Sequence, residues 1–187
     1  MHEEMPRPVD GQMAGFQLWV NLPARLKMTR PRYQEIASAR IPEVQRSDGT
    51  RIRVIAGMVD GVRGPVTEIA ADPTYLDVSL PPGGLFTSPV DRGHMAFAYL
   101  YGELDGNATF EPDGQTLRPP KLVVFGDGDQ IQIAAAGQSA RFLLVSGKPL
   151  GEPIARYGPF VMNTAGEIQQ ALEDLRSGTF VWGTRQM

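Results

Sequence analysis

Few residues in this chain have the chemistry of a reactive site. The sequence holds two histidines and no cysteine, so disulfides and thiolate chemistry are excluded, and a metal would need histidine, carboxylate or carbonyl ligands. The run His2–Glu3–Glu4 places an imidazole two residues before a carboxylate, a pair that iron or manganese can use. By itself the pair favours a polar terminus, because single histidines and glutamates are common.

The second histidine and one acidic run are better explained by loops. His94 follows Gly93 at the start of an apolar run, and a catalytic base there would need an orienting partner, which the sequence does not show. We therefore expect a loop histidine. Asp127–Gly128–Asp129 lacks the further oxygen ligands and the spaced glutamate of a calcium loop, so it predicts a tight turn.

The charge of the chain excludes two classes of partner. A formal charge of -3 over 187 residues opposes nucleic acid and anionic membranes, which need a strong positive field. The densest basic stretch is therefore predicted to be a solvated linker; it comprises Arg25, Lys27, Arg30 and Arg32. The first ten residues lack the basic start and apolar core of a signal peptide, and no apolar run has membrane-spanning length. These features predict a cytoplasmic protein.

Short apolar runs between glycines and prolines predict an all-β body. Leu76–Leu80 and Gln130–Ile133 alternate apolar and polar residues, as half-buried strands do. Continuous apolar runs of strand length occur at Ala96–Tyr101, Leu122–Phe125 and Phe142–Val145, and Ile52–Ala56 is nearly continuous. Many short strands at this spacing indicate a sandwich, jelly roll or barrel. We interpret five aromatic residues as packing residues of this body: Trp19, Phe97, Tyr99, Tyr101 and Phe160.

Both ends of the chain add one element. Thr164 and Glu167 form a capping-box pattern ahead of an apolar stripe, and Gly178 follows as a stop signal. We expect an amphipathic helix there, packed on the outside of the barrel. The apolar run at Phe16–Leu22 predicts one isolated strand. Its backbone N–H and C=O groups need to pair with another strand, so it has to be part of some sheet.

Several stretches of the sequence resemble the pirin family. They are Gln17–Pro23, Lys27–Met28, Tyr33–Gln34, Ile41–Pro42, Gly147–Ile154, Tyr157–Thr164 and Glu167–Ile168. The resemblance implies a double cupin, made of two jelly-roll barrels of the double-stranded β-helix type. It also implies one non-haem iron (Fe2+), or another divalent metal, held in the amino-terminal barrel by three histidines and one glutamate.

The start of the chain resembles the later ligand motif of that family, in which His-x-Glu precedes Met-Pro. By this resemblance His2 and Glu4 are metal ligands. The earlier His-x-His pair has no counterpart, so we expect most of the first barrel to be missing. Met1 is then a start codon assigned too late, a fragment boundary or a real start.

The resemblance implies two functions of different classes. Several pirins act as quercetin dioxygenases, which implies a flavonoid-like small-molecule substrate. We expect this chain to lack appreciable dioxygenase activity, because two ligands do not make the family's site. Other pirins are metal-dependent partners of transcription factors, which implies a non-enzymatic regulatory module with a protein partner.

The second barrel can be compared with the first cupin motif, Gly-x5-His-x-His-x3-Glu-x6-Gly. Gly83 and Gly102 fit its end glycines. The ligand positions of this motif, and the histidine position of a second one, then fall on Pro89, Asp91, Met95 and Ile131. Only Asp91 binds hard cations, so we predict that side chains fill this barrel and that its role is structural or protein-binding.

The resulting domain prediction has four parts. Residues 1–24 are the remaining edge of the first barrel, and 25–50 are the linker between barrels. Residues 51–163 form the second cupin barrel, and 164–178 form the carboxyl-terminal helix. A homodimer that pairs the Phe16–Leu22 strands would complete the sheet of the isolated strand.

Overall fold

The structure is a computed structural model that describes residue 11 and residues 15–102, 108–110 and 114–180. The chain divides into two units, which we call the barrel unit (Gln34–Pro149) and the end unit (the residues before Gln34 and after Pro149). The barrel unit therefore begins and ends at other residues than the predicted barrel, 51–163. Among the described residues, no helix is long and apolar enough to cross a membrane.

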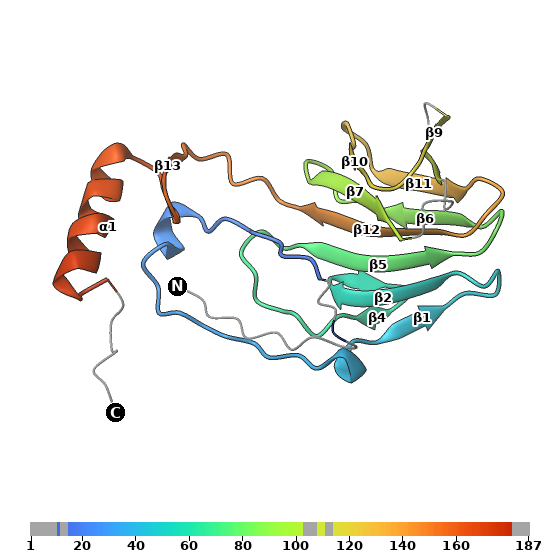
Figure 1. Cartoon of the computed structure of the whole chain (residues 1–187), viewed down its shortest axis with the longest axis horizontal. Coiled ribbons are helices and arrows are strands. Elements are labelled where there is room, and N and C mark those ends of the chain that lie inside the picture. Colours follow the sequence, from blue (N-terminus) through green and yellow to red (C-terminus); the bar gives the residue numbers. More distant parts are fainter. Residues whose placement is uncertain (1–10, 12–14, 103–107, 111–113, 181–187) are drawn as a thin grey trace. The chain divides into compact units, whose positions relative to one another are not determined.

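Two antiparallel sheets build the barrel unit (Figure 1). The larger sheet has the order β1 (Glu43–Gln45), β2 (Arg51–Ala56), β5 (Thr74–Leu80), β12 (Ala140–Gly147), β7 (Met95–Tyr101) and β10 (Lys121–Val124). The smaller sheet has the order β6 (Leu85–Pro89), β11 (Gln130–Ala135), β8 (Ala108–Phe110) and β9 (Gln115–Leu117). Two shorter elements complete the unit, a 3-10 turn at Ser38–Arg40 and a hairpin of β3 (Met58–Val59) and β4 (Val62–Arg63). Every strand predicted between residues 52 and 145 overlaps one of these strands, which confirms the all-β prediction.

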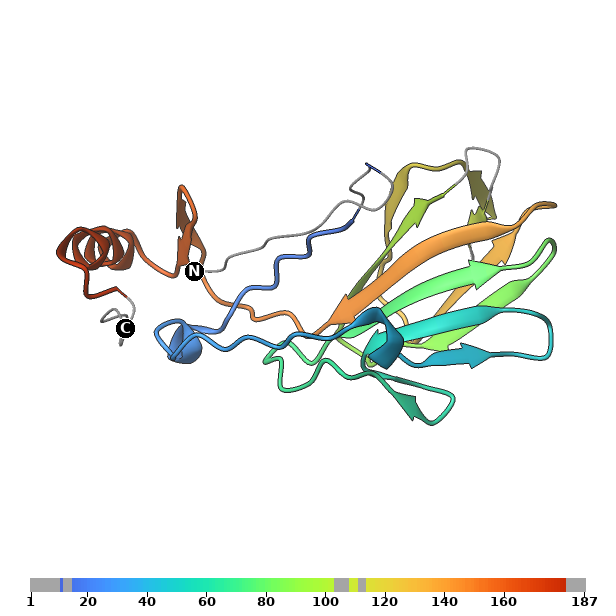
Figure 2. The same ribbon diagram turned by 60° about the horizontal axis from the view of Figure 1, so that its bottom comes forward.

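The barrel core follows from the two-residue period of its strands. In β2, β5, β7 and β11, buried residues alternate with partly or fully exposed ones, so each strand turns one face inward. In Figure 2, the long strands β2, β5 and β12 run side by side. The largest fully buried side chains include Ile52, Val54, Leu76, Val78, Leu80, Phe86, Leu100, Ile133, Phe142 and Leu144. The rings of Phe86 and Phe142 meet edge to face, 5.5 Å apart, so side chains fill the interior as predicted.

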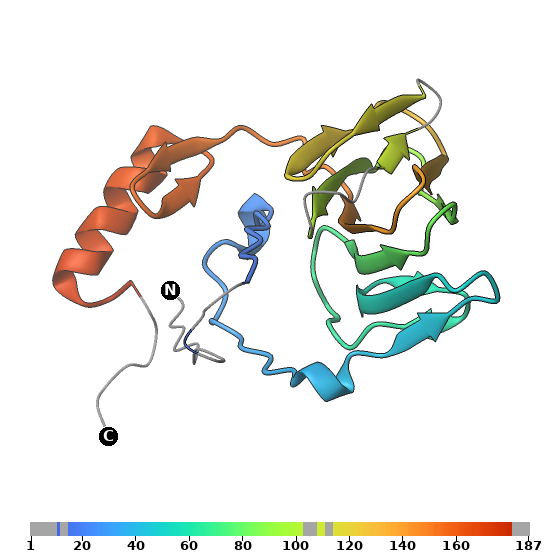
Figure 3. The same ribbon diagram turned by 45° about the vertical axis from the view of Figure 1, so that its right-hand side comes forward.

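The end unit is built around a short hairpin and one helix. The hairpin pairs β13 (Ala155–Tyr157) with β14 (Phe160–Met162), and the helix α1 (Ala165–Ser177) lies against it (Figure 3). The Thr164 hydroxyl accepts a bond from the Glu167 backbone N–H, and the Glu167 carboxylate accepts one from Thr164 in return. Gly178 ends the helix at φ 74°, a left-handed conformation that glycine adopts at little cost. Both predicted caps are therefore confirmed.

Polar contacts join the two chain ends inside this unit. The segment before Gln34 contains a 3-10 turn at Ala24–Leu26. The Ala24 N–H donates to the Glu152 carboxylate at 2.7 Å, and the Lys27 ammonium donates to the Val161 carbonyl at 2.9 Å. Lys27 is therefore an anchoring residue, although we predicted a solvated linker residue. The reason is its 2.7 Å bond to the side chain of Asn21, which holds the ammonium over the hairpin carbonyl.

Three other predictions for the amino-terminal part differ from the structure. Among the described residues, Phe16–Leu22 is not a strand. An apolar run does not by itself make a strand, because a strand also needs a neighbouring backbone with which to form a ladder. Strand β1 lies inside the predicted linker 25–50 and pairs with β2. Trp19 is 59% exposed, so the prediction that it packs in a core is wrong.

Candidate functional site

The described residues contain no ready-made metal site. His2 and Glu4 lie outside the described residues, so their predicted role stays a prediction. Within the ranges that the structure covers, no three or more histidine, cysteine or acidic side chains gather closely enough to bind a metal. His94 lies in the loop between β6 and β7, as predicted, and its backbone N–H donates to the Asp91 carbonyl at 3.0 Å.

The cupin-motif positions do not line the barrel interior as a ligand set. Pro89 and Asp91 are exposed, and Met95 is 63% exposed, whereas Ile131 is buried. On β6 the buried side chains are Phe86 and Ser88, which are offset by one residue from the motif position at Pro89. Because side chains alternate along a strand, this offset turns the aligned position to the outer face. The position of Asp91 therefore rules it out as a ligand inside the barrel.

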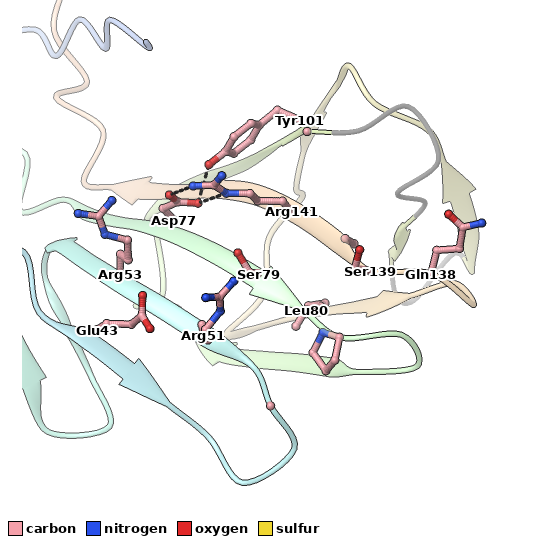
Figure 4. A pocket seen from close by; sticks show the side chains of 14 residues that line it. Glu43, Arg51, Arg53, Asp77, Ser79, Leu80, Tyr101, Gln138, Ser139 and Arg141 are labelled. Atoms are coloured by element: carbon pink, nitrogen blue, oxygen red, sulfur yellow. Dashed lines mark hydrogen bonds and ion pairs between the residues drawn. The ribbon is translucent and has the colours of Figure 1, made fainter. Parts of the chain in front are cut away.

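A connected polar cluster lies instead on the outer face of the larger sheet (Figure 4). Arg141 of β12 makes two bonds to the Asp77 carboxylate of β5, at 3.1 and 2.7 Å. The Tyr101 hydroxyl of β7 donates to the same carboxylate at 2.6 Å, and the Arg141 guanidinium lies 4.9 Å from the centre of the Tyr101 ring. The three strands are neighbours in the sheet, and register places Arg141 directly opposite Tyr101.

This cluster is built to hold its charges, not to exchange protons. Burial, together with the hydrogen bond to Asp77, raises the pKa of the Tyr101 phenol far above its ordinary value. The hydrogen bond to Asp77 likewise raises the pKa of Arg141. At neutral pH Tyr101 therefore remains a neutral donor, and Arg141 remains a cation whose orientation is set by Asp77 and the Tyr101 ring.

The cluster forms one wall of a pocket of about 550 Å³ on the outer face of the sheet. Arg51 and Arg53 of β2 and Ser79 of β5 line it further, as Figure 4 shows. Loop residues close one end; they are Gly49, Pro81, Gln138 and Ser139. The Arg53 guanidinium donates to the hydroxyl of Ser38 at 2.7 Å and to its carbonyl at 3.1 Å.

The sequence contained a signal for these residues that we did not use. Arg51, Arg53, Asp77 and Ser79 are the polar members of two alternating strands, and such residues share the outer face. What the pattern does not contain is strand order, which brings Arg141 next to Asp77 from 64 residues away. We interpreted Tyr101 as a packing aromatic residue, and its ring does stack with that of Tyr99 at 6.5 Å. Its hydrogen bond to Asp77 was not predicted.

Comparison with known proteins identifies similar sequences over nearly the whole chain. Residues 75–181 match the family described as the Pirin C-terminal cupin domain. A pirin-like protein of Caulobacter vibrioides is 41% identical over 181 residues, which cover 96% of this chain and 63% of the relative. Pirin of Homo sapiens is 38% identical over 181 residues, which cover 95% of this chain and 60% of the relative.

A solved structure leads to the same result for the fold. The crystal structure of a quercetin 2,3-dioxygenase from Acinetobacter baumannii superimposes with a TM-score of 0.77 at 34% identity. The superposition covers 87% of this chain and 55% of that one. The predicted cupin fold is therefore confirmed. The chain spans less than two thirds of the length of these relatives.

Proposed function

Because this chain belongs to the pirin family, we propose that the metal-dependent quercetin 2,3-dioxygenase activity of that family is incomplete in these 187 residues, in which His2 and Glu4 supply two ligands for iron or another divalent metal. Support comes from the resemblance of His2–Pro6 to the family's ligand motif and from the name of the Acinetobacter baumannii relative. The substrate in this proposal is a flavonoid-like small molecule, and the site of action is the cytoplasm.

The residues of this chain do not fit the family's metal site without further ligands. That site takes three histidines, and the whole sequence has two, of which His94 lies in a loop of the barrel unit. The observation that carries the proposal is the barrel interior, which is filled by apolar side chains from both sheets. We therefore propose that the barrel unit has a structural role and that the 187 residues alone do not open flavonols.

The test is an activity measurement on the purified 187-residue chain. It is loaded with ferrous iron in the absence of oxygen, oxygen is admitted, and loss of quercetin is followed by absorbance. We expect no turnover above free iron, while a full-length relative serves as the positive control. Turnover comparable with that relative would sink the proposal. Iron retained after desalting, compared between wild type and His2→Ala, reports separately on whether His2 is a ligand.

A second candidate function is a non-enzymatic, metal-linked protein-binding module. The observation that favours it is the run of exposed apolar side chains at Phe16, Leu18, Trp19, Val20 and Leu22. Such a run is typical of a surface that pairs with a protein partner or with a second copy of the chain. Light scattering tests the second copy, because a monodisperse monomer at high concentration contradicts the homodimer. A pull-down with and without metal tests the dependence on metal.

A further inference from the structure

The pocket on the outer face of the larger sheet holds donors in an arrangement that suits an anion. Ser79 lies directly opposite Arg51 on one side and Arg141 on the other, because β5 is the strand between β2 and β12. Neighbouring strands lie about 4.8 Å apart, so the two arginine backbones are about 10 Å apart with the serine midway. Both arginine side chains line the same pocket as that serine.

Two of these donors are available to form hydrogen bonds with a ligand. Within the described part of the chain, neither the Arg51 guanidinium nor the Ser79 hydroxyl has a hydrogen-bond partner. The Asp77 carboxylate, in contrast, is occupied by Arg141 and Tyr101. Asp77 therefore fixes the direction of Arg141 without neutralising Arg51. A guanidinium held in place by a carboxylate and by an aromatic ring loses little entropy when it binds a further oxygen.

The local charge is opposite to that of the whole protein. Three arginines line the pocket, Arg51, Arg53 and Arg141, against two carboxylates, Glu43 and Asp77, which leaves an excess of one positive charge. The chain as a whole has a formal charge of -3. Arg53 is anchored by the hydroxyl and carbonyl of Ser38, which are neutral acceptors and leave its charge in place. The field in the pocket therefore favours anions.

We propose that this pocket binds a small molecule through one oxyanion group, a phosphate or a carboxylate, placed over Ser79 between Arg51 and Arg141. The Ser79 hydroxyl and the two guanidinium groups donate to its oxygens, and Pro81 contacts the remainder of the ligand. A volume of about 550 Å³ accommodates a ligand of metabolite size. This site is separate from the family's metal chemistry and needs no metal.

The test is an NMR titration of the whole chain with inorganic phosphate and, in a second series, with citrate. Sodium chloride keeps the ionic strength constant, because salt screens exposed charges and would imitate weak binding. We expect saturable shifts of the Ser79 and Arg141 amide signals with a dissociation constant of about 1 mM. Arg51→Gln should weaken binding about tenfold, since it removes one charged donor.

A matched control makes the result specific. Arg92→Gln removes the same charge from a largely exposed arginine that pairs with Asp129 and does not line this pocket, so binding should be unchanged. Shifts with phosphate alone, or with citrate alone, identify the group that the pocket takes. The proposal is overturned if neither anion gives saturable shifts, or if Arg92→Gln and Arg51→Gln weaken binding equally. Ser79→Ala gives an independent check, because it alters no charge.

Discussion

The barrel unit and the end unit are each stabilised by a different kind of interaction. In the barrel unit, two sheets enclose a continuous apolar core with several large side chains wholly removed from solvent. Among the described residues of the end unit, the buried hydrophobic ones are Ile168 and Ala171 of α1. Of the fifteen exposed large apolar side chains in the described residues, ten belong to the end unit. The barrel unit therefore has its own source of stability, and the end unit has little.

What stabilises the end unit is directional bonding. The capping box of α1, the Lys27 bond to Val161 and the Glu152 bonds to Ala24 and Asn163 join segments that share little core. Each such bond contributes about 1 kcal/mol, whereas one large buried side chain contributes more. The difference predicts that core substitutions act on the barrel globally and that cap substitutions act on the end unit locally.

The largest expected effect is that of Phe86→Ala. Phe86 is fully buried, packs against Phe142 and lies beneath the guanidinium of Arg46, so the truncation leaves a cavity that its neighbours cannot fill. We expect the free energy of unfolding, measured with urea, to fall by about 3–5 kcal/mol. The control is Leu122→Ala, whose side chain is 55% exposed and should cost less than about 1 kcal/mol. Similar losses for both would show that the barrel core is not tightly packed.

Much of the barrel and of the helix was predictable because the relevant signals are local. Alternation in Leu76–Leu80 reflects the geometry of a single strand, and the pattern of Thr164 and Glu167 reflects that of a single helix turn. Phe16–Leu22 was predicted wrongly for the complementary reason. Its composition suits a strand, but pairing depends on a neighbour that no local pattern describes.

The polar pocket was not predicted because its residues come from four strands. Arg51, Asp77, Tyr101 and Arg141 meet only once the order of β2, β5, β12 and β7 is known. The predicted metal ligands differ from the pocket residues, because they are close together in the sequence. His2 and Glu4 were identified from their resemblance to a short motif, and their spacing alone carried almost no information.

A smaller effect is expected for Thr164→Ala, which removes the amino-terminal cap of α1. The Glu167 N–H then loses its acceptor, at a cost of about 1 kcal/mol to the helix. We expect faster hydrogen exchange for the first-turn amides of α1, while amides of β5 and β12 stay unchanged. Thr164→Ser keeps the hydroxyl and should restore protection. Equal acceleration in the barrel strands would contradict the difference between the two units.

The smallest expected effect concerns the other half of the same cap and depends on pH. Backbone N–H groups of Asn163 and Thr164, at 2.9 and 2.7 Å, hold the pKa of Glu167 below its ordinary value of 4.5. Folding of α1 thus favours the ionised carboxylate, which also suits the positive end of the helix dipole. By linkage, the stabilisation is complete well above pH 4.5 and is lost as the pH falls through the lowered pKa of the folded state.

Chemical shifts of Ile168 and Ala171, followed from pH 7 down into the acid range, report this loss, because both residues lie on the helix that the cap stabilises. Glu167→Gln separates this carboxylate from the other acidic residues of the end unit, since the amide oxygen still accepts a hydrogen bond but does not titrate. In that variant the acid fraying of α1 should be smaller. If wild type and variant lose helical shifts over the same pH range and to the same extent, Glu167 is not the group responsible. The acid response of the end unit would then originate in groups other than Glu167.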